Sequence, residues 1–225
     1  MLRKKTKRIM RGIGNVYRRE IMRDRPLLEA KRWFRDQGDK TLRLNYPLTK
    51  DDVVVDLGGY VGDWASEIHD RFGCTVHLFE PVPALYTRCN ERFAQTPNVY
   101  VHQYGLSDKD GVFAITDDGD ASSFISLEKT GTHIECELRA ANTALKALGV
   151  THIDLLKLNI EGGEYEVLPI LFAHGWLQRI NFFQIQFHTV GDYKAQRDAL
   201  RAALSETHTE QWCYEFVWEG WARKS

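Results

Sequence analysis

The sequence has no long hydrophobic run and no closely paired cysteines. None of its apolar stretches approaches the roughly 20 residues that a membrane-spanning helix needs. No short apolar segment follows the basic N-terminus, as a secretory signal would require. The four cysteines are scattered without a C-x-x-C pair, which is typical of reduced thiols in a cytosolic protein. With no internal repeat and no low-complexity linker, we expect a cytoplasmic, globular chain.

Charge of both signs is present but is unevenly distributed. Residues 1–32 contain 12 Lys/Arg and 3 Asp/Glu, a net charge of +9, whereas the remainder contains 18 and 28, a net charge of −10. We therefore divide the chain into a basic helical N-terminal arm, residues 1–40, and a larger domain, residues 41–225. The arm is either a solvated helix or frayed terminus, or it attracts an anionic surface such as acidic lipid. The acidic body opposes nucleic acid, so peripheral membrane contact or an anionic substrate is the favoured interpretation.

Strands and helices alternate along the chain, as hydrophobic periodicity and glycine or proline punctuation indicate. One or two amphipathic helices are expected within 9–35, turn residues at 105–111 and a small antiparallel insertion within 112–139. The other expected helices are 62–71, 83–93, 140–148, 164–173 and 194–204, and the expected strands are 53–57, 75–79, 98–104, 153–160, 180–187 and 211–218. This alternation predicts an α/β fold with a parallel sheet covered on both faces.

A glycine-rich turn after the first strand predicts a nucleoside cofactor. Gly58, Gly59 and Gly62 follow a run of β-branched residues and let the chain turn sharply, close to a ligand. Glu80 lies 18 residues past Gly62, at the end of the next strand. A carboxylate at that place accepts hydrogen bonds from the hydroxyls of a ribose.

The turn lacks the G-x-G-x-x-G fingerprint of a dinucleotide site. The strand before it ends in Asp56, whose carboxylate would repel a pyrophosphate but suits the sulfonium and amino groups of S-adenosylmethionine. We therefore expect S-adenosylmethionine as the cofactor. Two alternatives share the strand, turn and acid: an NAD-dependent or nucleotide-sugar oxidoreductase, and a membrane-associated, non-catalytic nucleotide-binding protein.

Polar residues at the ends of two later strands predict a reaction pocket. Asn159 and Glu161 end one strand and Gln186 and His188 the other, and neighbouring parallel strands bring such ends together. His188 is the expected general base, because imidazole takes up a proton near neutral pH; the alternative is a histidine that only closes a strand. Glu161 either orients that imidazole, contacts the amine of the donor or caps the following helix.

Two charged neighbours of this pocket have simpler interpretations. Lys157 is expected to pair with an acid, and Glu164 to favour the dipole of the helix that it begins. A divalent metal bound by Glu161 with Asn159, Gln186 or His188 is a further hypothesis, although this set has few carboxylates.

Aromatic residues occupy every second position of the last predicted strand: Trp212, Tyr214, Phe216 and Trp218. Core packing is the expected role, and a platform for stacking on a sugar is the alternative. Tyr46 and Ser123 lie in predicted loops that are able to close over an acceptor. Together with Gln186 and Trp218, they are the expected substrate contacts.

Four motifs give the chain a resemblance to FkbM-type S-adenosylmethionine-dependent methyltransferases. They are Asp56-x-Gly58-x-x-x-Gly62, Phe79-Glu80-Pro81, Leu106-Ser107-Asp108 and the segment from Lys157 to Glu164. The resemblance covers roughly residues 42 to 222. Further likeness, in Leu42 to Leu48, Ile185 to His188 and Phe216 to Glu219, is with a subgroup of bacterial surface-polysaccharide biosynthesis. Tyr60 stands where many relatives have Asn, and Asn159 where many have Asp.

The resemblance implies a class I methyltransferase fold, a Rossmann-like sheet of seven strands with the last one antiparallel. It also implies methyl transfer to a hydroxyl of a sugar or glycan. In that reaction the polar strand ends described above place Asn159, Glu161 and His188 as the expected catalytic residues. On the basis of the resemblance, Asp56, Gly58, Tyr60 and Gly62 would line the methionyl part of the donor, Glu80 and Pro81 the ribose side, and Ser107 and Asp108 the adenine.

Overall fold

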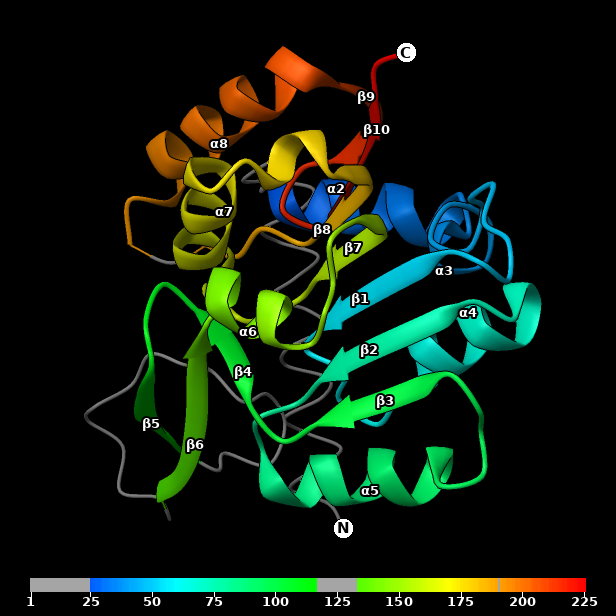
Figure 1. Ribbon diagram of the computed structural model, residues 1–225. Helices are drawn as coiled ribbons and strands as arrows, with labels where there is room; N and C mark the ends of the chain where they lie inside the picture. The colour runs from blue at the N-terminus through cyan, green and yellow to red at the C-terminus, as the bar shows by residue number, and fades with distance from the viewer. Residues whose placement is uncertain (1–24, 117–132, 190) are drawn as a thin grey trace, which may run out of the picture.

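A seven-stranded sheet forms the centre of the molecule, with helices on both faces (Figure 1). The computed structural model describes residues 25–116, 133–189 and 191–225. The sheet has the order β3-β2-β1-β7-β8-β10-β9. Its strands are β1 (Val53–Leu57), β2 (Thr75–Phe79), β3 (Val99–His102), β7 (Ile153–Leu158), β8 (Ile180–Ile185), β9 (His208–Tyr214) and β10 (Trp218–Arg223). Strand β10, the last in the chain, pairs antiparallel with β8 and with β9, and the other pairs of this sheet are parallel. The predicted fold class is therefore confirmed.

The two faces of the sheet carry separate hydrophobic cores. Val54 and Val76 pack with helices α4 (Asp63–Phe72) and α5 (Pro83–Phe93) on one face. Val55 and Leu57 pack with α6 (Ala141–Ala147), α7 (Glu164–Ala173) and α8 (Tyr193–Thr207) on the other. Burial on both faces explains why β1 reads as a continuous apolar run instead of an alternating one.

The N-terminal helices that the structure describes pack at the edge of the sheet formed by β9 and β10. They are α2 (Arg25–Arg35) and the short α3 (Gly38–Thr41). Trp33 of α2 is only 2% exposed, and its ring lies 5.8 Å from that of Trp212 and 5.1 Å from that of Tyr214. This part of the predicted arm therefore shares a core with the sheet. Most of the basic residues precede residue 25 and lie outside the described residues.

A second, three-stranded sheet follows β3. It consists of β4 (Gly105–Ser107), β6 (His133–Ala140) and β5 (Gly111–Thr116), in that order. The antiparallel pairing of β5 with β6 confirms the predicted insertion. The prediction of turn residues throughout 105–111 is wrong at its start, because residues 105–107 pair with β6 as a strand. Ser123 lies outside the described residues, so its expected acceptor contact stays a prediction.

The C-terminal segment forms two strands where the sequence predicted one. β9 ends at Tyr214 and β10 begins at Trp218, with Phe216 between them at a φ of +57°. The prediction that the four aromatic rings share one face of a single strand is therefore wrong. Trp212, Tyr214 and Trp218 pack around Trp33, whereas the Phe216 ring lies 5.1 Å from Tyr193.

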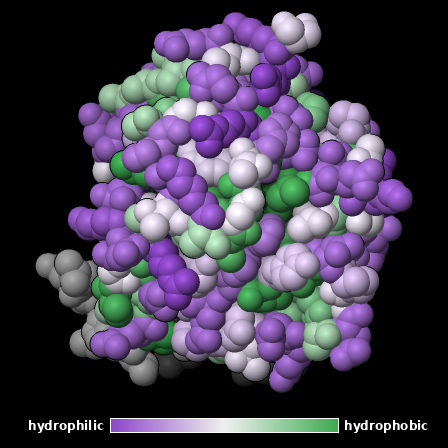
Figure 2. Space-filling model, in the orientation of Figure 1, coloured by the Kyte–Doolittle hydropathy of each residue, from purple (hydrophilic) through white to green (hydrophobic). Residues whose placement is uncertain are grey.

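The surface on the side of β2, β3 and the second sheet is largely hydrophilic, with hydrophobic residues in small patches (Figure 2). Among the described helices, α8 is the longest at 15 residues, and none is both long and apolar enough to cross a membrane. The short η2 (Trp176–Gln178) connects α7 to β8.

Candidate active site

The glycine turn, residues 58–62, connects β1 to α4 at the carboxyl end of the sheet. Gly58 has a φ of +83°, and a Cβ there would lie 2.0 Å from the main-chain oxygen of Asn159. Gly62 has a φ of +80° and is the N-cap of α4. Gly58 is thus required by its close approach to the residue that follows β7, a contact that the sequence pattern does not reveal.

The amides of the glycine turn donate to acceptors within the protein. The amides of Gly58 and Gly59 both donate to the carbonyl of Phe79, at 3.0 and 3.2 Å. The Tyr60 amide donates to Glu80 Oε2 at 2.8 Å, and the Gly62 amide to the carbonyl of Gly59 at 2.8 Å. A pyrophosphate binds to such a turn through amides that point at the ligand. Because these four amides are already used, the turn does not favour a dinucleotide.

Asp56 is paired with Lys157 across the β1–β7 register. Lys157 Nζ lies 2.7 Å from Asp56 Oδ1 and 2.7 Å from the carbonyl oxygen of Gly58. The expected pairing of Lys157 with an acid is confirmed. Asp56 is not the uncompensated negative charge that we invoked to select a sulfonium, because Lys157 supplies a positive charge beside it.

Two buried oxygens next to this pair have no hydrogen-bond partner among the described residues. They are Asp56 Oδ2 and Asn159 Oδ1, at the ends of β1 and β7. A buried acceptor without a partner is costly, so each oxygen is ready to accept from a donor group of a ligand. The ammonium of a methionyl group carries such donors, and the residues present therefore fit S-adenosylmethionine.

Glu80 is 4% exposed and accepts two main-chain hydrogen bonds. Its Oε2 accepts from Tyr60 and its Oε1 from Val82, at 2.8 and 3.0 Å. Burial raises the pKa of Glu80 to about 7, although the two amides act in the opposite direction. Each oxygen keeps a second lone pair, so the carboxylate is still able to accept from ribose hydroxyls.

Ser107 and Asp108 lie where β4 ends. The Ser107 side chain is buried, and its Oγ lies 2.8 Å from Glu166 Oε2 of α7 and 3.1 Å from Asp108 Oδ1. Glu166 was not among the expected site residues. Its contact connects the predicted adenine segment to α7.

His188 lies between two carboxylates, and we call Glu161, His188 and Glu164 the His188 triad. His188 Nδ1 is 2.9 Å from Glu164 Oε1, and the His188 amide donates to the same oxygen at 2.6 Å. On the opposite side of the ring, His188 Nε2 is 3.4 Å from Glu161 Oε1. The side chain of Glu164 is fully buried, whereas that of Glu161 is 38% exposed.

The loop after β7 has an unusual backbone that places both carboxylates. Glu161 has a φ of +52° and Gly162 a φ of +110°. The Gly162 amide donates to Glu164 Oε2 at 3.0 Å, and the Tyr165 hydroxyl donates to the carbonyl oxygen of His188 at 2.7 Å. A non-glycine residue in this conformation is strained, which is typical of functional sites. That Glu161 orients the imidazole, or contacts the amine of the donor, stays a prediction. Its contact with His188 is observed.

The triad gives His188 a charge state different from the one that we assumed. Burial by itself would lower the pKa of His188, but the hydrogen bonds and charges of Glu161 and Glu164 raise it to about 9. His188 is therefore mostly protonated at neutral pH, and both of its ring nitrogens face an acid. Glu164, which we expected only to favour a helix dipole, is a direct partner of this imidazole.

Asn159 and Gln186 were expected within strands 153–160 and 180–187, but β7 ends at Leu158 and β8 at Ile185, so each residue begins the loop after its strand. The Asn159 amide donates to the carbonyl of Leu57, and the Gln186 amide to the carbonyl of Leu158. These bonds continue the pairing of β1, β7 and β8 by one step. The structure thus brings Asn159 to the end of β1 and Gln186 to the end of β7.

Two expected substrate contacts are buried. Tyr46 is 9% exposed, packs on Phe182 and hydrogen-bonds with the side-chain amide of Gln184. Trp218 is 5% exposed, and the guanidinium carbon of Arg43 lies 4.3 Å from the centre of its ring. A ring that stacks on a sugar needs an open face. Trp218 therefore belongs to the core, which was the first of its two interpretations.

A metal held by Glu161 with Asn159, Gln186 or His188 stays a prediction. In the described ranges, the one group of three His, Cys, Asp or Glu residues with suitable spacing is Glu210, Cys213 and Glu219. Its carboxylates already contact Arg197 and Arg201, so it is an ion-pair network. We derive no step that uses a metal.

Comparison with known proteins gives one family match and several similar folds. Residues 56–212 match the model of the methyltransferase FkbM domain. No curated protein sequence matches the chain. A putative rRNA methylase from Clostridium thermocellum has a similar structure, with a TM-score of 0.54, 9% identity, and coverage of 84% of this chain and 95% of that one. At this identity the likeness shows the fold alone. A putative methyltransferase from Streptococcus mutans in complex with SAH has a TM-score of 0.48, 12% identity, and coverage of 85% and 97%.

Proposed function

The chain belongs to the FkbM methyltransferase family, and we propose that it is an O-methyltransferase for a hydroxyl of a sugar or glycan. S-adenosylmethionine is the methyl donor. The observation that supports O-methylation is the His188 triad at the ends of β7 and β8. A hydroxyl loses its proton as its oxygen attacks a methyl group, so the acceptor needs a base at that place.

The donor would lie across the carboxyl ends of β1, β2 and β7. Asp56 and the glycine turn, with Gly58, Tyr60 and Gly62, would contact its methionyl part. Glu80 and Pro81 would contact the ribose side, and Ser107 and Asp108 the adenine. The donor supplies an electrophilic methyl group, and the protein supplies position and a proton acceptor.

In this proposal neutral His188 accepts the proton of the acceptor hydroxyl at Nε2. The new bond joins the acceptor oxygen to the methyl carbon, and the electron pair of the broken carbon–sulfur bond stays on sulfur. Glu164 fixes the proton of the imidazole on Nδ1 and orients the ring. Asn159 Oδ1, which has no partner in the described part of the chain, would accept from another hydroxyl of the acceptor, and Gln186 would contact the same sugar.

The sugar acceptor is supported by charge and by the sequence resemblance. The chain beyond residue 32 carries a net charge of −10, which opposes a polyanion such as RNA. A neutral glycan has no backbone charge, and a nucleotide sugar has a single diphosphate instead of a phosphate at every unit.

A direct test measures which acceptor takes up the label from methyl-labelled S-adenosylmethionine. The panel contains nucleotide sugars, lipid-linked glycans, neutral oligosaccharides and RNA. We expect label in a sugar as a base-stable methyl ether. Label that enters only RNA or protein would contradict the proposal.

The basic arm leads to a second, separate proposal, a cytoplasmic location with peripheral contact to acidic lipid. Residues 3–8 include Arg3, Lys4, Lys5 and Lys7, and each basic residue near acidic lipid is worth about 1 kcal/mol. We expect the full chain to co-sediment with vesicles that contain phosphatidylserine, and expect this to weaken when the four residues are replaced by Gln. Equal co-sedimentation of both proteins would contradict the proposal.

A further inference from the structure

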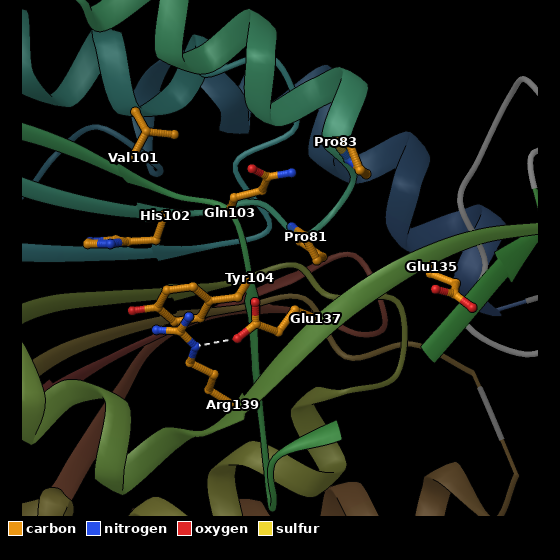
Figure 3. Close-up of a pocket in the computed structure, with 9 residues that line it drawn as sticks. All are labelled: Pro81, Pro83, Val101, His102, Gln103, Tyr104, Glu135, Glu137 and Arg139. Carbon is orange, nitrogen blue, oxygen red and sulfur yellow. Dashed lines mark hydrogen bonds and ion pairs between the residues drawn. The ribbon is translucent and has the colours of Figure 1, made fainter. Parts of the chain in front are cut away.

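The free edge of β3 has a pocket that shares only Pro81 with the residues proposed to bind the donor. Its volume is about 560 Å³, within the range of small-molecule sites. Val101 and His102 are neighbours on β3 whose side chains point to opposite faces of the sheet, yet both line the pocket. It therefore opens at the edge of the sheet, beside β3 and away from the His188 triad. We call it the edge pocket; its far wall is the outward face of β6 (Figure 3).

An exposed guanidinium and an exposed amide, those of Arg139 and Gln103, line the edge pocket, whereas the Tyr104 ring is only 7% exposed and lies under the guanidinium. The guanidinium carbon of Arg139 lies 3.9 Å from the centre of the Tyr104 ring, and Arg139 Nε lies 2.6 Å from Glu137 Oε1. Figure 3 shows the amide of Gln103 on the opposite side of Tyr104, near Pro81. Such groups match a sugar ring, because a sugar has apolar C–H faces and hydroxyls that both donate and accept.

The charges of the edge pocket oppose an anionic ligand. Among the described residues, its wall has two carboxylates, Glu135 and Glu137, against one guanidinium, and Arg139 already forms an ion pair with Glu137. His102 adds no positive charge at neutral pH, because burial, followed by the charges of His77 and Arg139, lowers its pKa to about 4. A phosphate would therefore meet a net negative wall, whereas a neutral polyol would not.

We propose that the edge pocket binds a neutral sugar residue of the acceptor glycan, at a distance from the hydroxyl that is methylated. This inference rests on the proposed function. Strands β3 and β8 are four positions apart in the sheet, which corresponds to about 19 Å at the usual strand spacing. Only an acceptor long enough to cover this distance contacts both the edge pocket and the His188 triad.

Kinetics with acceptors of different length test the inference. The test variant is the double substitution Gln103→Ala and Glu137→Ala, at two exposed positions. The matched control is Gln178→Ala with Glu206→Ala, two exposed positions elsewhere on the surface. For the test variant we expect the KM of a long oligosaccharide to rise about tenfold, a loss of about 1.4 kcal/mol. We expect kcat, the affinity for the donor and the KM of a monosaccharide with the same terminal sugar to stay unchanged.

An equal change in KM for the long and the short acceptor, or no change in either, would overturn the proposal that the edge pocket binds a sugar. A second measurement does not depend on methylation: calorimetric titration of the full chain with neutral oligosaccharides in the absence of donor. We expect binding that the test variant weakens and the control variant does not. No binding of any neutral oligosaccharide would also overturn the inference, as would RNA binding that is lost in the test variant. Sugar binding at the pocket with no sugar methylated would instead leave the pocket in place and reject the proposed function.

Discussion

The protonation of His188 sets the pH at which a hydroxyl would be methylated. Its pKa is raised to about 9, so the neutral form that accepts a proton is about one hundredth of the total at pH 7. We therefore expect kcat/KM to rise about tenfold per pH unit from 7 and to level off near 9. A pH–rate profile that is flat between 6 and 9 would remove His188 from the role of base.

Neutralising one carboxylate of the triad tests the cause of this profile. In Glu161→Gln one of the two charges that raise the pKa of His188 is gone and Glu164 remains, so the rising limb should move part of the way to lower pH. His188→Ala should lower kcat by about 10²- to 10⁴-fold, because general-base catalysis contributes about that much, and donor affinity should not change. Glu91→Gln, on the exposed side of α5, is the control and should leave the profile in place.

Glu80 predicts a pH dependence of donor binding. Its folded pKa of about 7 lies above the ordinary value because of burial, so at pH 6 most molecules have a protonated carboxyl. The ribose hydroxyls favour the ionised form, and binding of the donor should therefore release a proton. Calorimetry should find S-adenosylmethionine bound up to about tenfold more tightly at pH 8 than at pH 6. The Glu80→Gln variant should bind more weakly at pH 8 and show little dependence on pH; the same slope in both proteins would contradict the assignment.

At the residue scale, the sequence predicted which residues lie at the strand ends better than it predicted which residues they contact. His188, Glu161 and Asn159 follow adjacent strands, so topology alone brings them together. The role of Glu164 was not predictable, because a carboxylate in the first turn of a helix is common and only the fold shows it bonded to His188. The pairing of Asp56 with Lys157 depends on strand register, which the polar pattern of one strand does not contain.

The docking of α2 on the sheet depends on one side chain. Trp33 is 2% exposed between Trp212 and Tyr214, whereas its neighbour Phe34 is 72% exposed. Trp33→Ala should lower the free energy of unfolding by about 3 kcal/mol, the lower end for a large buried aromatic. Phe34→Ala, in the same helix, should change it by less than about 0.5 kcal/mol. Denaturant unfolding measures both, and equal effects would show that α2 is not docked as described.

At the element scale, many boundaries were predictable, among them the starts of β7 at Ile153 and of β8 at Ile180. α5 begins at Pro83 and ends at Phe93 as expected, and α4 ends next to Gly73 at a φ of +67°. The turn between β9 and β10 has neither glycine nor proline, and Phe216 adopts the left-handed conformation there. Tertiary packing, and not local preference, produces this turn. The alternating aromatic residues on both sides of it therefore looked like one continuous strand, with no residue that marked the turn.

For the whole molecule, the burial of the cysteines predicts their reactivity. Cys74, Cys89 and Cys136 are fully buried, and burial raises the pKa of each thiol, to about 11 for Cys74 and Cys136 and about 12 for Cys89. All four cysteines lie in the described ranges and none is in a disulfide there. Iodoacetamide should therefore label these three very slowly in the folded protein and all four rapidly in denaturant. Mass spectrometry that finds Cys89 labelled as fast in the folded protein as in the unfolded one would contradict the structure.

The internal bonding of the glycine turn limits how the enzyme's cofactor preference can be re-engineered. The Phe79 carbonyl and the Glu80 carboxylate occupy three of its amides, and both acceptors belong to the adjoining strand end. Exchanging loop residues for those of a dehydrogenase would leave these acceptors in place. A switch to nicotinamide chemistry would thus require moving the end of β2, a change of backbone instead of side chains.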